Sequence, residues 1–459
     1  MRFLVLSISL LFACISCDTG KASSSAVAPD DTLEDTSSED GVKGKDTATG
    51  NGAPTDSTET GSTDTATGST INSLDEKLDE ASLLRITELL ASDEMGGRNE
   101  GSPGSEAARE LILERLRSCG IDPAGDSGYE QRVVGSKCVN LIGQVPGNDP
   151  DLEDEHILLS AHYDHLGECG GKICNGAYDN AAAVAAVIEI ACVAAEQPGD
   201  RGLLVALWDC EEPPTFLTDN MGSEYFAAHP TIPLEDIPAS IVLDLFGSEL
   251  WPNFNGLIVL GTETSDVLRN HVDELPPIPG LQAFNMGLHA IEEQPFGHHP
   301  FSDYDAFRNR EVPVVFISDG KNKDYHEPTD DWDHIVPEKL VLETRWVLHL
   351  THSILGGEET PTWQGHPHLG LDGLEAAIEV GNIALGKTDI PGIVPSLGLN
   401  SQSKSKLTSD IKALEKIRAR ILSSGDELTK TDIKAVRKAA QRLMCLAGSS
   451  PAEFFCGLL

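Results

Sequence analysis

Three stretches of the sequence decide the fold: HILLSA at residues 156–161, AAAVAAVIEIACVAA at residues 181–195 and LLVALW at residues 203–208. The first and third are short apolar runs, which are typical of strands buried on both faces of a sheet. The second is long enough for a helix, and its small residues suit a helix that lies flat on a sheet. This alternation predicts an α/β fold.

The same pattern continues on either side of these stretches. We predict further strands at residues 138–145, 240–245, 257–260 and 312–317. Apolar residues at helical spacing predict helices within residues 83–90, 107–116 and 338–354. The expected architecture is therefore a mixed, mostly parallel central sheet sandwiched by helices.

Residues 1–17 predict an export signal. Arg2 gives a positive start, and residues 3–15 form an apolar run too short for a permanent membrane-spanning helix. The segment ends like a lipoprotein signal, in which a cysteine becomes the lipidated first residue, and Cys17 fits this position better than Cys14. An ordinary cleaved signal is the alternative. We expect an exported protein, either a lipoprotein of the cell envelope (outer membrane or periplasm) or a secreted one.

Three segments follow the signal. Residues 18–72 are rich in Ser, Thr, Gly and Asp, and this composition predicts a disordered acidic tether because it buries too little apolar surface. Residues 73–356 contain the predicted sheet. Residues 357–459 predict a small C-terminal helical extension, with one helix around residues 371–383 and two within residues 405–447. We expect this extension to serve as a scaffold or interaction module.

The overall charge restricts the partners. The formal net charge of −41 at pH 7 repels nucleic acid and anionic lipid, so we expect neither as a partner. Membrane contact is expected only through the anchor at Cys17, and the protein is expected to be a monomer.

Eight of the ten cysteines follow the signal, and an exported protein permits disulfides. We expect two short-range pairs, Cys169 with Cys174 and Cys445 with Cys456. Cys192 lies on the apolar helix and Cys210 follows a strand, so both are predicted to be buried free thiols.

Acidic residues and histidines lie at or just after the ends of several predicted strands, where open α/β sheets place their sites. The candidate metal ligands are His162, Asp179, Glu212, Asp244 and His326. Asp244 is the most informative, because Leu flanks it on both sides and a buried aspartate needs a partner. Likewise, two adjacent glutamates leaving a buried strand, Glu211 and Glu212, are costly unless a cation awaits them.

Each candidate also has a structural explanation when taken alone. Asp179 could cap a helix, and His326 competes with other histidines nearby. Asp164 could accept the second ring N–H of His162 and so fix its orientation. Taken together, nitrogen and oxygen ligands without thiolates suit zinc. One ion would take His162 and Asp244, the other Glu212 and His326, with Asp179 bridging at a metal–metal distance of roughly 3.5–4 Å.

Six segments between residues 83 and 355 resemble the M28-type zinc peptidase family, which contains bacterial leucyl aminopeptidases and glutaminyl cyclases. These segments are MGGR at residues 95–98, AHYDHLG at 161–167, GAYDNAA at 176–182, DCEE at 209–212, IVLDLFG at 241–247 and DYHEPTDD at 324–331. The resemblance implies the zinc-dependent exopeptidase fold. It implies that the five candidate ligands bind two zinc ions, that Glu211 is the general base, and that Asp164 orients the first histidine.

The resemblance implies an aminopeptidase that hydrolyses the first peptide bond of substrates with a free N-terminus, using a hydroxide activated by two zinc ions. Two departures keep alternatives open. A longer loop, residues 213–221, precedes Gly222, as it does in the cyclases, and Tyr304 stands where the family usually has histidine. A glutaminyl-peptide cyclotransferase with one zinc is the first alternative, and a non-catalytic binding protein on the same fold is the second.

Overall fold

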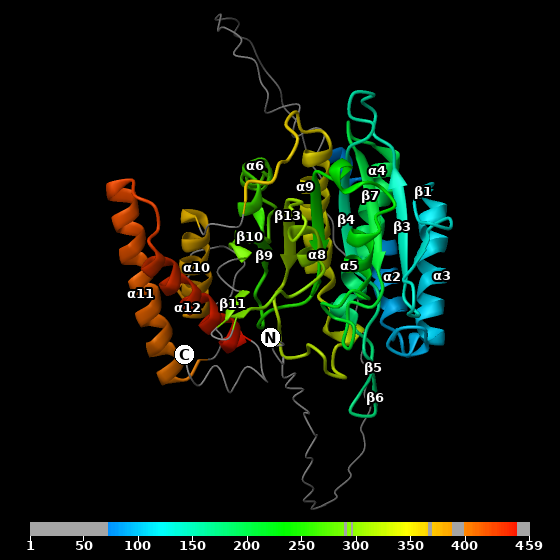
Figure 1. Ribbon diagram of the computed structural model, residues 1–459. Helices are drawn as coiled ribbons and strands as arrows, with labels where there is room; N and C mark the ends of the chain where they lie inside the picture. The colour runs from blue at the N-terminus through cyan, green and yellow to red at the C-terminus, as the bar shows by residue number, and fades with distance from the viewer. Residues whose placement is uncertain (1–71, 289–291, 295–296, 366–369, 388–398, 448–459) are drawn as a thin grey trace, which may run out of the picture. The chain divides into compact units, whose positions relative to one another are not determined.

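The computed structural model describes residues 72–288, 292–294, 297–365, 370–387 and 399–447 (Figure 1). These residues belong to one compact unit. The predicted signal, the predicted tether up to residue 71 and the Cys456 end of the predicted C-terminal disulfide lie outside the described residues.

A mixed nine-stranded sheet forms the centre of the molecule. Four central strands run parallel in the order β7 (Gly202–Trp208), β4 (His156–His162), β8 (Ala239–Leu243) and β13 (Val314–Ser318). Antiparallel neighbours flank them, β3 (Val139–Val145) beside β7 and β9 (Gly256–Leu260) beside β13. The outer strands are β1 (Asp122–Pro123) and β2 (Glu130–Arg132) on β3, and β10 (Gln282–Asn285) parallel to β9. The predicted fold class is confirmed.

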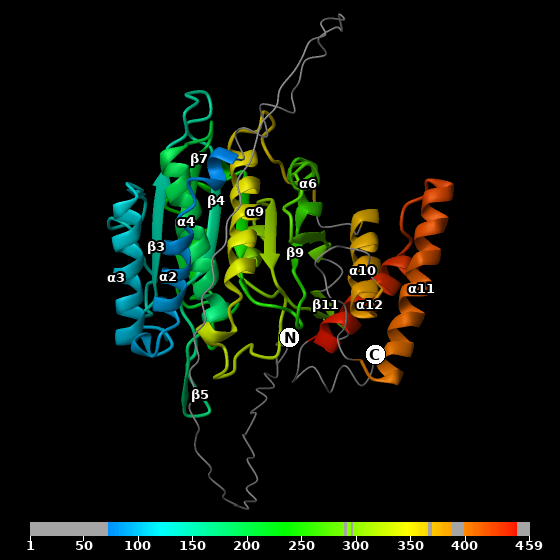
Figure 2. The same cartoon turned by 180° about the vertical axis from the view of Figure 1, so that it is seen from behind.

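Helices cover both faces of the sheet (Figures 1 and 2). One face packs on α2 (Glu80–Leu90), α3 (Pro103–Ser118), α4 (Ala182–Glu196), α6 (Asp266–Asp273) and α9 (Pro337–Leu355). The other packs on α5 (Gly222–Ala228), α8 (Tyr304–Arg308), α10 (Leu371–Ala384) and α12 (Lys430–Ala447), and α11 (Ser401–Ser424) packs on α10 and α12. Side chains along β7 point alternately to the two faces of the sheet. Leu203 and Val205 pack in the core on the first face, and Leu204 and Trp208 pack in the core on the second.

The C-terminal helices take part in this second core. Leu374 of α10, Leu407 of α11 and Val436 of α12 are fully buried in the same cluster as Trp208 and Phe316 of the sheet. The helices that the sequence predicts as an extension therefore cover one side of the sheet and help to bury it. The domain boundaries drawn from the sequence stay predictions.

The short elements lie in the connections. Two hairpins are separate from the main sheet, β5 (Gly167–Cys169) with β6 (Lys172–Cys174), and β11 (Glu293–Gln294) with β12 (Gly297–His298). Short 3₁₀ turns occur at Asp93–Met95, Leu234–Asp236, Thr262–Thr264 and Trp332–His334. The segment Ala177–Glu196 is apolar and long enough to cross a membrane, but it is wholly buried, as is typical of a core helix.

Three disulfides occur among the described residues. Cys169–Cys174 closes the β5–β6 hairpin, which confirms that prediction. The prediction of free thiols at Cys192 and Cys210 is wrong, because Cys192 pairs with Cys119 and Cys210 pairs with Cys138. These pairs span 73 and 72 residues, so they depend on how α3 packs against α4 and how β3 pairs with β7, which spacing alone does not reveal.

Candidate metal centre

The carboxyl ends of the parallel strands bring the predicted site residues to one edge of the sheet. His162 is the last residue of β4, and Asp244 directly follows β8. Glu211 and Glu212 follow β7. His326 lies in the loop after β13, and Asp179 lies in the irregular turn Ala177–Ala181 before α4. Asp179 does not cap α4, whose N-cap is Ala181 and has no side-chain cap.

A first group of ligand atoms gathers around His162. Its Nε2 atom lies 3.2 Å from Asp244 Oδ1 and 3.3 Å from Asp179 Oδ1. All three side chains are buried. Their candidate ligand atoms lie within 4.8 Å of one another, which is a spacing that a single cation could share.

A second group forms on the other oxygen of Asp179. Asp179 Oδ2 lies 3.4 Å from His326 Nε2, and that nitrogen lies 3.0 Å from Glu212 Oε2. His165 also belongs here, with its Nδ1 atom 2.8 Å from Glu212 Oε1 and 3.9 Å from Asp179 Oδ2. Asp179 thus faces both groups, one with each carboxylate oxygen.

The donor set fits a pair of cations. Asp179 Oδ2, Glu212 Oε1 and both ring nitrogens of His165 are buried without a hydrogen bond of acceptable geometry, although His165 and Glu212 are close in distance. These atoms lie close together but are not aligned for hydrogen bonds. Ligand atoms that bind the same metal ion are arranged in this way. Buried carboxylates this close together are also costly without positive charge between them. Nitrogen and oxygen donors without thiolates suit zinc.

Burial and the neighbouring charges shift the acidity of this cluster in opposite directions. Burial raises the pKa of the Glu211 carboxyl well above its usual value. Burial alone would also raise the pKa of the Asp179 carboxyl. Its contacts with His162 and His326 instead hold that pKa well below the usual value. Burial lowers the pKa of His326, yet Asp179 and Glu212 outweigh it and raise that pKa to about 10. The Asp179 carboxylate therefore keeps its negative charge between two histidines, whereas burial favours the neutral form of Glu211.

His165 was not among the predicted ligands. It stands in the same HYDH motif as His162, and this spacing is the signal that could have drawn attention to it. Its ring lies edge-on to that of His326, with the centroids 6.0 Å apart. Gly176 makes room for it, because a Cβ there would lie 2.5 Å from His165 Cγ, and its φ of +60° also favours glycine.

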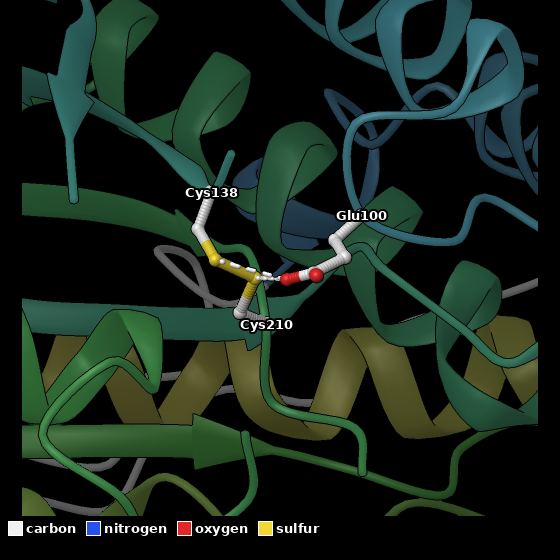
Figure 3. Close-up of side chains that lie close together, drawn as sticks. All are labelled: Glu100, Cys138 and Cys210. Atoms are coloured by element: carbon white, nitrogen blue, oxygen red, sulfur yellow. Dashed lines mark hydrogen bonds between the residues drawn. A yellow bond between two sulfur atoms is a disulfide. The ribbon is translucent and has the colours of Figure 1, made fainter. Parts of the chain in front are cut away.

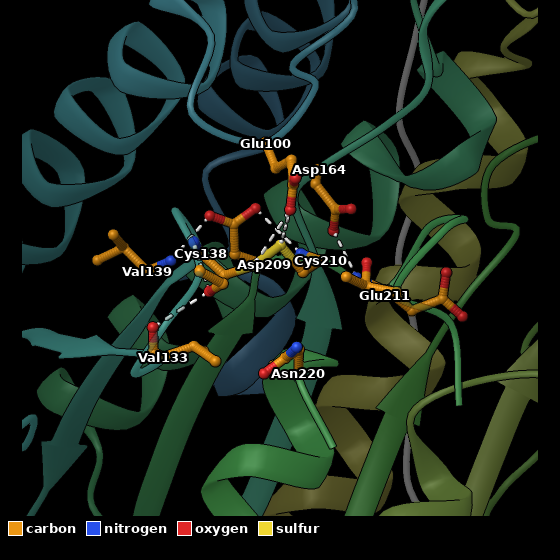
Figure 4. Close-up of a disulfide and its surroundings, with 12 residues drawn as sticks. Glu100, Val133, Cys138, Val139, Asp164, Asp209, Cys210, Glu211 and Asn220 are labelled. Carbon is orange, nitrogen blue, oxygen red and sulfur yellow. Dashed lines mark hydrogen bonds between the residues drawn. A yellow bond between two sulfur atoms is a disulfide. The ribbon is translucent and has the colours of Figure 1, made fainter. Parts of the chain in front are cut away.

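The carboxylate of Asp164 holds the glutamate pair by its backbone. Asp164 Oδ1 accepts the N–H of Glu211 at 3.1 Å (Figure 4). Its Oδ2 atom accepts the N–H of Glu212 at 3.2 Å. His162 Nδ1 lies 3.2 Å from the backbone carbonyl oxygen of Asp164 and 3.7 Å from its carboxylate. The carboxylate therefore acts mainly on the glutamates, and the backbone carbonyl is the nearer partner of the histidine.

Arg98 ties two of the ligand segments together. Its fully buried guanidinium donates to the carbonyl oxygens of Tyr163 at 2.8 Å and Gly176 at 2.9 Å, and also to that of Asn175. Tyr163 follows His162, and Gly176 opens the turn that carries Asp179. Burial lowers the pKa of Arg98 to about 10. The sequence marked Arg98 only as part of a family motif, since its partners are backbone atoms that no side-chain pattern reveals.

A disulfide lies directly beside the glutamate pair. Cys210, which precedes Glu211, is bonded to Cys138 at the start of β3 (Figure 4). Glu100 points at this bond, with its Oε2 atom 2.8 Å from Cys210 Sγ and 3.4 Å from Cys138 Sγ (Figure 3). Because the sulfurs are bonded to each other, they cannot act as thiolate ligands beside Glu100.

The backbone is strained next to several ligands. Cys210, Leu245 and His326 have φ values of 64°, 58° and 60°, in the left-handed region that non-glycine residues rarely adopt. Cys210 precedes the glutamates and Leu245 follows Asp244, so each strained residue is a candidate ligand or lies next to a site residue. Such outliers cluster at functional sites, where the surrounding structure holds them in place.

Comparison with known proteins agrees with this geometry. Residues 140–351, which include all the candidate ligands, match the model of peptidase family M28. This part of the chain, somewhat less than half of it, is similar to the M28 peptidases. An uncharacterised protein of Escherichia coli (strain K12), YfbL, is 26% identical over 267 residues, covering 53% of this chain and 79% of that protein.

Among solved structures, the LapA aminopeptidase of Legionella pneumophila is similar to this chain in fold. Its TM-score is 0.51 at 16% identity, over 64% of this chain and 76% of that one. At this identity the likeness concerns the fold. A glutaminyl cyclase of Porphyromonas gingivalis has a TM-score of 0.47 at 17% identity, over 60% of this chain and 98% of that one.

Proposed function

We propose that the protein is a zinc-dependent aminopeptidase that removes the N-terminal residue of peptides. The observation that carries this proposal is the position of Asp179, whose two oxygens face His162 at 3.3 Å and His326 at 3.4 Å. A carboxylate shared in this way between two nitrogen and oxygen donor groups is an arrangement suited to two ions. The match of this region to family M28 supports the same conclusion.

The side chains around the cluster have separable roles. His162, Asp179 and Asp244 would hold one zinc ion, and Asp179, Glu212 and His326 the other. When bound, zinc supplies a Lewis acid that polarises the substrate carbonyl and makes water acidic enough to attack near neutral pH. Asp179, Glu211 and Asp244 also line a cavity beside the cluster, where the free N-terminal amine of a peptide would lie next to the metal site.

Glu211 is placed to carry the proton. Its Oε2 atom lies 3.9 Å from His162 Nε2, at the cluster but outside both groups of ligand atoms. Its carboxylate would take a proton from the attacking water and return it to the nitrogen of the leaving amine, as the scissile C–N bond breaks and the new C–O bond remains. Asp164 would hold Glu211 in position through the backbone N–H.

The test compares three peptides that differ only at the N-terminus, with leucine, acetylated leucine or glutamine in the first position. The zinc-loaded full chain should release free leucine from the first peptide and leave the acetylated one intact. Cleavage of the acetylated peptide would contradict the requirement for a free amine. Formation of pyroglutamate from the glutamine peptide, without release of any residue, would establish the cyclase instead.

We also propose that the protein is exported and anchored through a lipid on Cys17. The three disulfides support an oxidising compartment, because such bonds are rare in cytosolic proteins. Labelled palmitate should be incorporated into the wild-type chain and not into Cys17→Ala, and the wild type should fractionate with membranes. Incorporation into Cys17→Ala but not into Cys14→Ala would move the anchor to Cys14.

A further inference from the structure

The cavity beside the metal cluster is mostly apolar. Its volume is about 230 Å³. Its polar lining consists of Asp179, Glu211, Asp244, Ser318, Lys321 and Tyr325, and its apolar wall includes Leu250, Leu260, Met286, Phe301 and Phe316. An apolar protein cavity of about 150 Å³ already admits benzene, so this one is large enough for a bulky side chain.

Part of this wall comes from the C-terminal helices. Val380 of α10 and Ala440 and Leu443 of α12 line the cavity. All three are nearly fully buried, with exposed fractions of 2%, 1% and 5%. They lie beyond residues 140–351, which are the residues that match the family model. Part of the cavity wall is therefore built by a segment of the chain that contains none of the carboxylates of the cluster.

We infer that α10 and α12 form the side of the pocket that receives the first side chain of the substrate, and that they select large apolar residues such as leucine, phenylalanine and methionine. This inference rests on the proposed aminopeptidase function. A peptide whose amine lies against the carboxylates would direct its first side chain into the apolar part of the cavity. A charged side chain that packs against Val380, Ala440 and Leu443 would lose its hydration to apolar neighbours.

The wall also limits the size of that side chain. Leu443 fills space that a shorter residue would leave to the substrate, and Ala440 leaves space that a longer residue would occupy. One methylene group in a hydrophobic pocket changes kcat/KM by about 10- to 200-fold. Changes at these two positions should therefore shift selectivity in opposite directions.

The experiment measures kcat/KM for alanine, leucine and phenylalanine p-nitroanilides with the zinc-loaded full chain. The wild type should prefer leucine and phenylalanine to alanine by at least about tenfold. Leu443→Ala should raise the ratio of phenylalanine to leucine about tenfold, and Ala440→Leu should lower the ratio of phenylalanine to alanine by a similar factor.

Val436→Ala is the matched control. Val436 is a fully buried residue on α12 in the same core and does not line the cavity. Val436→Ala should leave the kcat/KM ratios among the three p-nitroanilides unchanged. If it changed them, the cause would be a general loosening of α12 rather than a change in the cavity wall. Unchanged ratios in both Leu443→Ala and Ala440→Leu would overturn the inference.

Calorimetric titration of L-leucine into the same proteins provides a readout that needs no turnover. L-leucine should bind the wild type and Val436→Ala alike and should bind Ala440→Leu at least about tenfold more weakly. If no variant hydrolyses any substrate, the aminopeptidase proposal fails, while the titration still decides whether this cavity takes an apolar amino acid. Equal binding by Ala440→Leu would overturn the pocket assignment even in an active enzyme.

Discussion

The carboxylate of Asp164 accepts the backbone N–H of Glu211 at 3.1 Å, and so joins the end of β4 to the end of β7 beside the metal cluster. Asp164→Asn keeps the shape of the side chain but replaces one of its two acceptor oxygens with an NH₂ group. One backbone N–H would keep its acceptor, and the other would face the amide hydrogens. Loss of such an outer partner typically costs about 10- to 100-fold in activity or metal affinity. We expect kcat to fall by that factor, measured with a leucine p-nitroanilide. An unchanged kcat would show that the glutamate pair holds its position without Asp164.

Glu211→Gln separates proton transfer from metal binding. The amide matches the size of the carboxylate but cannot take a proton, so kcat should fall by about 10²- to 10⁴-fold. Zinc content by elemental analysis should stay at the wild-type level, because the ligand sets do not include Glu211. Loss of zinc together with activity would instead make Glu211 a ligand.

Asp179→Ala should remove zinc from both positions, because its two oxygens face both groups of ligand atoms. Asp244→Ala should remove only the ion next to His162 and leave the other. Zinc per chain by elemental analysis distinguishes the two variants. Asp219→Ala, at an exposed aspartate of the loop after the glutamates, is the control and should bind as much zinc as the wild type. Equal zinc content in Asp179→Ala and Asp219→Ala would exclude a shared ligand.

Zinc should stabilise the folded protein even where no substrate is present. The clustered carboxylates repel one another in the apo protein, and an ion that binds only the folded state adds about 2.7 kcal/mol at a free concentration of 100 times its Kd. Differential scanning calorimetry should show a higher Tm after zinc is added to chelator-treated protein. Asp179→Ala should lose most of this increase, and a zinc response as large as that of the wild type would count against the proposed site.

The two long-range disulfides form a matched pair for testing the role of Cys210. They span 73 and 72 residues, so the chain-entropy model predicts about 4 kcal/mol of stabilisation from each. Cys119→Ala/Cys192→Ala and Cys138→Ala/Cys210→Ala should therefore lower the free energy of unfolding in urea by similar amounts.

Activity should separate these two double variants. Cys210 directly precedes Glu211, whereas Cys192 lies on α4 away from the glutamates. Loss of the Cys138–Cys210 bond should reduce kcat/KM by at least about tenfold under conditions where both variants remain folded. An equal loss of kcat/KM in both would mean that the disulfide beside the glutamates contributes only stability.

The sequence predicts most of the central sheet because its strands are local apolar runs. The predicted strands at residues 156–161 and 203–208 differ from β4 and β7 by one residue at one end. The same runs place His162 and Asp244 at one edge, and the structure brings these residues together, while their role as ligands stays a prediction. The fold class follows from these runs and is confirmed. The resemblance to family M28 came from the six motif segments, and the match of residues 140–351 to the family model confirms it.

Other features depend on contacts between distant segments. His165 joins the second group only because Gly176 leaves room for its ring, and Arg98 contributes through backbone carbonyls. The partners of Cys192 and Cys210 are set by helix packing and strand pairing. The cavity wall on α12 is invisible in the sequence, because Leu443 shows the same apolar spacing as any core residue of a helix.

Helices α10 and α12 share a core with Trp208, but the cavity residues that they supply are separate in sequence from the strand ends that carry the candidate ligands. Substitutions after residue 370 can reach the cavity wall without altering the strand ends that carry the histidines and carboxylates. Under the proposed function, changes in these helices alone would alter which peptides are trimmed, while the candidate ligands stay constant. A laboratory could exploit the same division by exchanging these helices between relatives to obtain new specificities on an unchanged reactive centre.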